Sequence, residues 1–368
     1  MTKFYNSNLG LIITSLILLC FGLVMVYSSS AIVTGEKKQD SFFFLKKQVL
    51  WAVVSIACFF FFLIYDYKKL QKFSQIGLVV SIILLILVLI IGKPVRDVRR
   101  WLTIGPVNFQ VSELTKIFIV IFLANYLDRK KSKIKDFFSG LLPALIAVGA
   151  VVFLIAIEPD LGIPLVIVIV SAILLFIAGA RWIHLFSITA VAAAAGYLAI
   201  ISKGYRIERF ISFLNPWKYS DSSGYQLVQS LISLGSGGFW GRGLGNSQLK
   251  KFYLPEMHTD FIFSIVGEEL GVIGVLLIVL LFVSLLYNGC KIALEATDLF
   301  GTLLAAGVTF TIVIQAFFNI AVCCGCIPTK GISLPFFSYG GSSLITTFIG
   351  IGILANISQH KRKDIRIK

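Results

Sequence analysis

The chain has 368 residues, of which 57% are hydrophobic and only 14% are charged. The apolar share is well above, and the charge content below, that of ordinary soluble domains, so the composition excludes a soluble globular protein and indicates one that crosses a membrane several times. The 33 Lys and Arg residues exceed the 18 Asp and Glu residues. Because no basic domain with interleaved aromatic residues occurs, this surplus favours membrane lipid or phosphate partners over nucleic acid.

Ten apolar segments follow one another along the chain. Each has about the length that an α-helix needs to cross the roughly 30 Å hydrocarbon core of a bilayer. A β-barrel would show alternating segments of about ten residues instead, and these do not occur. We therefore expect an all-α polytopic membrane protein with a single domain over residues 1–368. The expected spans are 9–32, 48–65, 74–92, 111–127, 138–157, 161–179, 182–201, 261–287, 299–324 and 338–357.

The basic residues of the short loops predict the orientation. When the long loop of residues 202–260 is set aside, the remaining loops hold 16 basic residues on one side and 9 on the other. This difference places both termini in the cytoplasm and the long loop, between the seventh and eighth spans, outside. The basic residues on the outer side then suggest a phosphate-bearing ligand there.

The long loop carries two patterns of its own. Residues 225–234 place leucines on one face and polar residues elsewhere, which predicts a short helix lying on the membrane surface. The glycine-rich segment 235–247 follows. It is either a flexible, turn-rich loop or a weak phosphate-binding cradle.

Four Asp, Glu, Lys or Arg residues lie inside the expected spans. Such a group costs roughly 2.5 to 3.5 kcal/mol on insertion scales, so each requires a partner or a water-filled cavity. Glu113 and Lys116 are three residues apart and meet on one helical face. They form either a structural ion pair or a pair that borders a ligand cavity. Glu268 and Glu269 are neighbours, about 100° apart around a helix, so at least one of them faces the bundle interior.

Several charged residues stand at the ends of the spans. Arg99 and Arg100 occupy a short external loop, where they are either solvated or bound to phosphate oxygens. Asp160 follows a proline and is expected to cap the next helix. His258 is either a hydrogen-bonded structural histidine or a ligand. Asp260 stands where the loop becomes a helix, and it is either an N-cap or a partly desolvated carboxylate that acts as a general base.

Five sequence blocks resemble the SEDS family, named for shape, elongation, division and sporulation. They occur in order over nearly the whole chain, and the TKG before ISLPFFSYGG is more similar to the division-type branch, FtsW, than to the elongation-type RodA. The blocks are GLVMVYSSSA (22–31), VRRWLTIGPVNFQVSELTK (98–116), EPDLG (158–162), GRGLGNSQLKKFYLPEMHTDFIFSIVGEELG (241–271) and IPTKGISLPFFSYGGSSL (327–344).

The resemblance implies a ten-span glycosyltransferase of the bacterial inner membrane that polymerises lipid II into peptidoglycan glycan strands. It implies a class B penicillin-binding protein as partner, together with other division or elongation proteins. Asp260 matches the aspartate of the family's HTDF motif and is implied to be essential, while Glu113 and Lys116 match its SELxK segment. The family commonly has a proline where this chain has Val111, which leaves the local helix geometry open.

The expected chemistry needs one carboxylate, because a lipid pyrophosphate leaves as a stabilised anion and requires no acid. Asp260 would accept the proton of the acceptor sugar's 4-hydroxyl, whose oxygen attacks C1 of the donor sugar and inverts the α-linkage to β. The departing diphosphate requires positive charge, from basic side chains or from a divalent cation such as Mg²⁺ or Mn²⁺ whose ligands are not predicted. The candidate supporting residues are Arg99, Arg100, Arg206, Arg209, His258, Glu268 and Lys330.

Two other functions fit part of the sequence. A lipid II flippase would also use ten spans with intramembrane charges, but carriers of that kind show inverted repeats, and none is found. A non-catalytic scaffold that recruits a penicillin-binding protein is the second alternative. Under that alternative, Asp260 would be dispensable.

Overall fold

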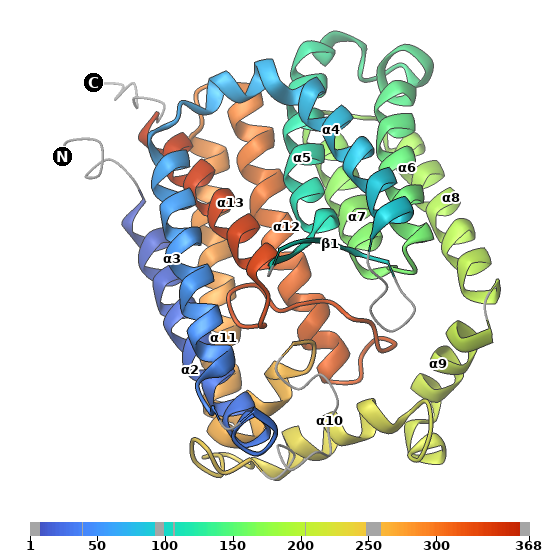
Figure 1. Ribbon diagram of the computed structural model, residues 1–368. Helices are drawn as coiled ribbons and strands as arrows, with labels where there is room; N and C mark the ends of the chain where they lie inside the picture. Colours follow the sequence, from blue (N-terminus) through green and yellow to red (C-terminus); the bar gives the residue numbers. More distant parts are fainter. Residues whose placement is uncertain are drawn as a thin grey trace.

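The computed structural model describes residues 8–38, 40–92, 99–105, 107–202, 204–247 and 259–360, and this part of the chain is almost entirely helical (Figure 1). A long helix occupies each of the ten expected spans, which confirms the all-α class. The helices are α2 (Leu9–Lys38), α3 (Phe43–Ile64), α4 (Leu70–Ile91), α5 (Val111–Arg129), α6 (Leu142–Ile157), α7 (Gly162–Ile177), α8 (Trp182–Ile201), α11 (Ile262–Glu295), α12 (Leu299–Cys323) and α13 (Gly341–Gln359).

Among the described residues, seven helices are by themselves long and apolar enough to cross a membrane. They are α2, α3, α4 with the preceding turn η1 (Tyr67–Lys69), α6 with the preceding π-turn η3 (Phe137–Leu141), α11, α12 and α13. The helices α7 and α8 are apolar but shorter. Helix α5 contains four charged residues within its 19 residues, and most of its side chains are buried. The bundle therefore shields α5 from lipid, which lets a charged helix lie at membrane depth.

The two helices at the ends of the chain begin and end on the same side of the bundle (Figure 1). The amide of Asn8, just before α2, donates to Ser358 Oγ near the end of α13 at 3.1 Å. A chain that crosses the membrane an even number of times has both of its ends on the same side, as here. The helices α9 (Gly204–Leu214) and α10 (Tyr225–Ser236) lie at the opposite end (Figure 1).

Burial separates central helices from outer ones. In the most apolar 18 residues of each helix, 83% of the residues are buried in α13 and 72% in α12, against 28% in α3 and 33% in α4. The outer helices expose apolar side chains such as Phe61, Ile64 and Ile90, as expected of surfaces that face lipid tails. The polar residues of α5, α12 and α13 are therefore collected at the centre.

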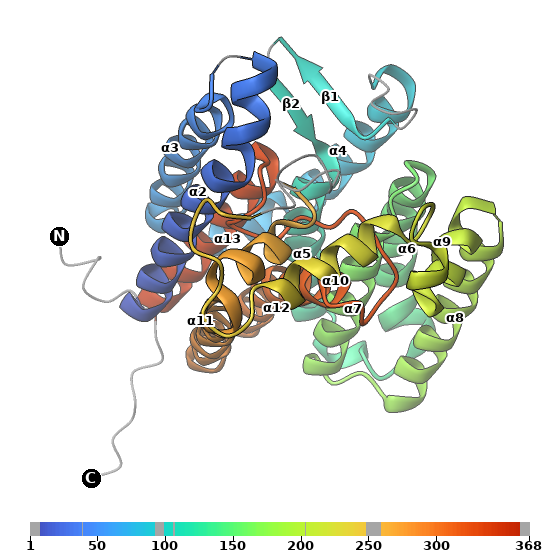
Figure 2. The same cartoon turned by 90° about the horizontal axis from the view of Figure 1, so that it is seen from below.

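The long loop between α8 and α11 is partly helical. Helix α10 confirms the short helix expected at 225–234, and it buries Leu227 and Val228. In Figure 2, α10 crosses the end of the bundle over α11 and α12, with which it is in contact. Helix α9 and the turn η4 (Pro216–Tyr219) were not predicted.

A short antiparallel hairpin, also not predicted, joins α4 to α5. Its strands are β1 (Trp101–Ile104) and β2 (Val107–Gln110), with Trp101 opposite Gln110. The amide of Gln110 donates to Ser342 Oγ at 2.9 Å. This bond ties the hairpin to the first turn of α13.

Candidate active site

Asp260 lies immediately before α11. The N-cap of this helix is Phe261, whose own side chain makes no capping hydrogen bond, so Asp260 stands one residue before the N-cap position. Asn319 of α12 holds the backbone at this point, because its Nδ2 donates both to the carbonyl of Asp260 and to that of Ile332, each at 2.7 Å. One amide group thus joins the start of α11 to the loop of residues 324–340, which we call the 324–340 loop.

The carboxylate of Asp260 faces the 324–340 loop at Gly331. A methyl group at Gly331 would lie 2.9 Å from Asp260 Oδ2, closer than real Cβ atoms approach an oxygen without a shift. Ser338 provides a second anchor, since its hydroxyl donates to the carbonyl of Thr259 at 2.6 Å. Asp260 is half-buried, so its carboxylate is held at the edge of the bundle and stays accessible.

Lys330 brings positive charge next to Gly331. Burial lowers the pKa of Lys330, the negative charge of Asp160 raises it, and the positive charge of Arg206 lowers it. The ammonium group therefore lies within electrostatic range of both residues. Arg206 is oriented by Tyr205, because its Nε donates to the Tyr205 hydroxyl at 3.0 Å and its guanidinium lies 5.6 Å from the ring centroid.

The turn between α6 and α7 forms the acidic side of the site. Asp160 Oδ1 accepts from the amide of Gly162 at 2.9 Å and from that of Ile163 at 3.4 Å, which confirms the expected helix cap. Burial raises the pKa of Asp160, while Arg100 and the two amides lower it. The turn also contacts the 324–340 loop, because a methyl group at Gly162 would lie 2.5 Å from the Ile332 side chain.

Glu158 lies in the same turn and is only 1% exposed. Neither carboxylate oxygen has a hydrogen-bond partner in the part of the chain that the structure describes. Burial, together with the charge of Asp160, raises the pKa of Glu158 to about 8, although Arg100 acts in the opposite direction. Glu158 is therefore mainly protonated at neutral pH. Arg100 binds the backbone of this turn, since its Nε donates to Glu158 O at 3.0 Å and its Nη2 to Pro159 O at 2.5 Å.

The remaining basic candidates are less close to this site. Arg99 Nη1 donates to the carbonyls of Leu89 and Ile90 at 3.2 Å each, so it satisfies the end of α4. Arg209 is exposed on α9. His258 lies outside the described residues. Of the predicted basic residues, the structure therefore brings Arg100 and Lys330 to the acidic turn, and Arg206 lies within electrostatic range of Lys330.

Glu113 and Lys116 form the expected buried ion pair. Lys116 Nζ lies 2.7 Å from Glu113 Oε2, and the two side chains are only 4% and 5% exposed. Lys116 also donates to Gln315 Oε1 of α12. Gln315 Nε2 in turn donates to the carbonyl and the hydroxyl of Ser333, at 3.0 Å each. The pair is thus connected through Gln315 to Ser333 of the 324–340 loop, two residues after Gly331.

Glu268 supports the long loop. It is 1% exposed and accepts from Ser233 Oγ at 3.0 Å and from Ser247 Oγ at 2.5 Å. Arg242 lies 3.7 Å from its other carboxylate oxygen. Glu269 is also buried and accepts from Ser28 Oγ of α2 at 2.7 Å. Both glutamates therefore face the interior, on different sides of α11.

The glycine-rich segment docks onto a kink in α11. The helix departs from helical geometry at Gly271, with φ 65°. The carbonyls of Glu268 and Glu269 accept from the amides of Arg242 at 2.9 Å and Gly243 at 3.0 Å. Gly241 has φ 78°, and a Cβ there would lie 2.2 Å from Glu269 O. Residues 238–243 are thus a docked segment, a role that neither sequence-based hypothesis included.

Two positioning residues, Gln315 and Asn319, were missed. They are four residues apart on α12 and both are buried. Amide side chains at this spacing inside an apolar span lie on one helical face and require partners. That signal was available in the sequence, although it does not reveal which loops the two amides hold.

A protein-family model described as a cell cycle protein, FtsW/RodA/SpoVE, matches residues 9–363. The chain belongs to the FtsW/RodA/SpoVE family. This membership confirms the SEDS resemblance, and with the membrane-spanning helices it identifies a multi-pass inner-membrane protein.

Relatives of this FtsW/RodA/SpoVE protein cover almost the whole chain. Stage V sporulation protein E of Bacillus subtilis is 43% identical over 364 residues, covering 98% of this chain and 99% of that protein. A probable peptidoglycan glycosyltransferase FtsW of Geobacter sulfurreducens is 40% identical over 353 residues, covering 95% of each.

Solved structures of the FtsW/RodA/SpoVE family share the fold. A chain from a study of polymerization and crosslinking by a peptidoglycan synthase complex is 27% identical with a TM-score of 0.80, covering 97% of this chain and 99% of that one. The rod shape determining protein RodA of Thermus thermophilus is 26% identical with a TM-score of 0.73, covering 97% of this chain and 98% of that one. The relatives near 40% identity are named FtsW and SpoVE, in line with the expected resemblance to FtsW over RodA.

Proposed function

We propose that this protein is a peptidoglycan glycosyltransferase that polymerises lipid II, with inversion at the donor's anomeric carbon, and that Asp260 is its catalytic base. The observation that carries the proposal is the half-buried carboxylate of Asp260, which faces Gly331 next to the cationic Lys330. The relatives named peptidoglycan glycosyltransferase support the reaction class.

The proposed reaction requires one proton transfer at the protein. Asp260 accepts the proton of the acceptor sugar's 4-hydroxyl, the freed oxygen forms a bond to C1 of the donor sugar, and the bond from C1 to the diphosphate oxygen breaks. Attack from the face opposite the leaving group converts the α-linkage to β. Because the diphosphate leaves as a stabilised anion, no second carboxyl group has to supply a proton.

Cationic side chains are proposed to receive the departing diphosphate. Lys330 and Arg206 lie within electrostatic range of each other, and phosphate oxygens accept well from such groups. Their mutual repulsion is relieved when a dianionic group lies between them, so their positive charge is most effective as the bond to C1 breaks.

A divalent cation, Mg²⁺ or Mn²⁺, remains part of the proposal only as a companion of the substrate. Within the described ranges, no group of three or more His, Cys, Asp or Glu side chains is placed to hold a metal ion. The described residues therefore do not form a resident metal site, and the diphosphate would bring the cation with it. Chelation by EDTA followed by titration of each cation tests this arrangement.

A class B penicillin-binding protein is the proposed partner, along with further division or elongation proteins. A structural relative at 27% identity comes from a peptidoglycan synthase complex, which supports the assignment. We also propose that both termini lie in the cytoplasm, which places Asp260 and the long loop outside. A cysteine-labelling experiment in intact cells tests this orientation at exposed Arg209→Cys and Lys131→Cys, each in a protein whose six native cysteines are replaced by serine. Only Arg209→Cys is expected to react.

The test of the catalytic assignment uses the purified protein with its partner and lipid II. Asp260→Asn is expected to abolish glycan product, while partner binding remains. Gly331→Ala is expected to reduce the rate by roughly tenfold to a hundredfold, since displacement of a reacting group by a fraction of an ångström is costly. Gly340→Ala is the matched control, because this residue is extended and has nothing within 4 Å of an added Cβ. Equal product from native protein and Asp260→Asn would instead support a scaffold.

A further inference from the structure

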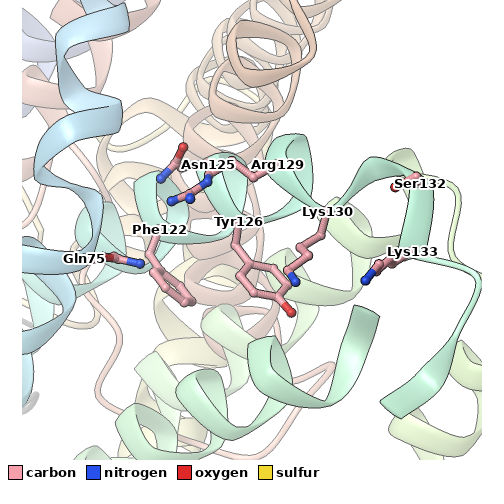
Figure 3. A pocket seen from close by; sticks show the side chains of 8 residues that line it. All are labelled: Gln75, Phe122, Asn125, Tyr126, Arg129, Lys130, Ser132 and Lys133. Atoms are coloured by element: carbon pink, nitrogen blue, oxygen red, sulfur yellow. The ribbon is translucent and has the colours of Figure 1, made fainter. Parts of the chain in front are cut away.

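A polar pocket lies at the C-terminal end of α5 (Figure 3). In Figure 1 this end of α5 is on the side of the bundle where α2 begins and α13 ends. It encloses about 390 Å³, which is within the range of small-ligand sites. Its walls come from α4, from the last turns of α5 and from the following 3₁₀ turn η2 (Lys131–Lys133). Neither Asp260 nor any residue of the 324–340 loop lines this pocket.

Three cations line this pocket. They are Arg129, Lys130 and Lys133, and Figure 3 shows the ammonium group of Lys133 pointing toward the side of the pocket where Lys130 lies. Within the described part of the chain, none of the three side chains takes part in an ion pair or a hydrogen bond. No carboxylate lines the pocket, so its interior carries uncompensated positive charge.

The dipole of α5 does not by itself account for this arrangement. Cations are favoured at a helix C-terminus, and loops on the cytoplasmic side are rich in Lys and Arg. Both effects apply equally to Lys131 and Lys135, which do not line the pocket. What sets Arg129, Lys130 and Lys133 apart is that they surround one concave space.

The pocket walls are fixed by contacts of their own. Asn125 Nδ2 donates to Ser74 Oγ at 2.6 Å, which joins α5 to α4. The Tyr126 hydroxyl donates to the carbonyl of Gly140 at 3.0 Å, and its ring stacks on Phe122 with centroids 5.9 Å apart. These contacts hold the pocket open without using its cations, which is the preorganisation that anion binding requires.

Apolar side chains beside the pocket indicate a ligand with hydrocarbon tails. Phe73 and Ile76 flank Gln75, a residue of the pocket wall on α4, and are 52% and 57% exposed. Phe138 of η3 is 75% exposed. Such side chains at the end of membrane-spanning helices face lipid, so a headgroup in the pocket can keep its acyl chains along α4.

We propose that this pocket binds the phosphate headgroup of an anionic phospholipid. The phosphate oxygens would accept from Arg129, Lys130 and Lys133, and Gln75 would offer an amide at the rim. The proposal is independent of the assignment of Asp260.

Binding can be measured by native mass spectrometry on the full chain in a neutral detergent. The probes are dioctanoyl phosphatidylglycerol, dioctanoyl phosphatidylcholine with the same tails and no net charge, and sn-glycerol 3-phosphate without tails. Lys130→Gln/Lys133→Gln removes two pocket cations. Lys131→Gln/Lys135→Gln removes the same charge from the same segment outside the pocket and is the matched control.

Phosphatidylglycerol is expected to bind the native protein and the control variant at least about tenfold more tightly than phosphatidylcholine, and the pocket variant is expected to lose about tenfold or more. Lys130→Arg/Lys133→Arg should retain binding, which separates charge from folding. Equal losses in both glutamine variants would overturn the proposal in favour of diffuse surface charge. Glycerol phosphate binding as tightly as phosphatidylglycerol would overturn it in favour of a soluble anion, and equal binding of the two lipids would exclude recognition of charge.

Discussion

Replacing Lys116 by methionine should destabilise the protein strongly. The substitution keeps an unbranched side chain, one atom shorter than that of lysine, but leaves the Glu113 carboxylate without its cation, 2.7 Å away in the native protein. It also removes the donor to Gln315 Oε1. Both acceptors are buried, since Glu113 and Gln315 are each 3% exposed, so water does not replace the lost partner.

The magnitude follows from the burial of the pair. Two unit charges 2.7 Å apart attract by about 6 kcal/mol at an effective dielectric constant of about 20. Removing one partner of a buried pair costs about 3–5 kcal/mol. This cost is smaller than the attraction between the two charges, because the remaining carboxylate can take up a proton. The double variant Glu113→Gln/Lys116→Met contains no unpaired charge. Its destabilisation should be at least about 2 kcal/mol smaller than the sum of the two single effects.

The free energy of unfolding can be measured in mixed micelles of dodecyl maltoside and sodium dodecyl sulfate, followed by tryptophan fluorescence. Lys291→Met is the control, because Lys291 pairs with Glu295 at 4.0 Å and the side chains are 48% and 34% exposed. An exposed pair of this kind contributes about 0–1 kcal/mol. If Lys116→Met costs no more than Lys291→Met, or if the two single effects add within about 0.5 kcal/mol, the reasoning about the buried pair is refuted.

Two further predictions concern stability. Gly241→Ala should lower the unfolding temperature far more than Gly245→Ala. Both glycines have positive φ (78° and 85°), but only Gly241 would place a Cβ against a backbone carbonyl, 2.2 Å from Glu269 O. Equal shifts would show that the docked segment moves to accommodate the added methyl group. Glu158→Gln should match the native stability near pH 4.5 and exceed it at pH 8. The pKa of Glu158 is about 8 in the folded protein against an ordinary value of 4.5, so ionisation favours the unfolded chain as pH rises through this window, by up to about 1.4 kcal/mol per pH unit. Parallel stability profiles of the two proteins between pH 4.5 and 8 would contradict the buried, protonated state.

The sequence predicted those features that depend on local pattern. Apolar length located the ten spans, and the spacing of three residues identified the pair of Glu113 and Lys116. The cap formed by Asp160 followed from its place after a proline. Helix α9 was missed because its charged residues made residues 204–214 read as part of a loop, although Ile207, Phe210 and Leu214 recur at helical spacing. The hairpin of residues 101–110 was missed because two strands of four residues carry little periodic signal.

The geometry of the site depends on contacts between residues far apart in the chain, and no local pattern contains them. Motif resemblance identified Asp260 but not its approach to Gly331, 71 positions later. The glycine-rich segment is similar in composition to a flexible loop, and only the kink at Gly271 shows which carbonyls its amides satisfy. Burial of Glu158 likewise arises from the packing of several loops, so its raised pKa was not foreseeable.

The amide of Asn319 has a consequence for mutational tolerance. Both of its N–H hydrogens are in use, one on Asp260 O and one on Ile332 O, so an acceptable replacement would have to offer two hydrogens from the same point. Aspartate has the same outline and offers none, leucine fills the volume and offers none, and glutamine carries its nitrogen one methylene too far. No other residue that the genetic code supplies reproduces this junction, and saturation mutagenesis should find position 319 among the least permissive on α12.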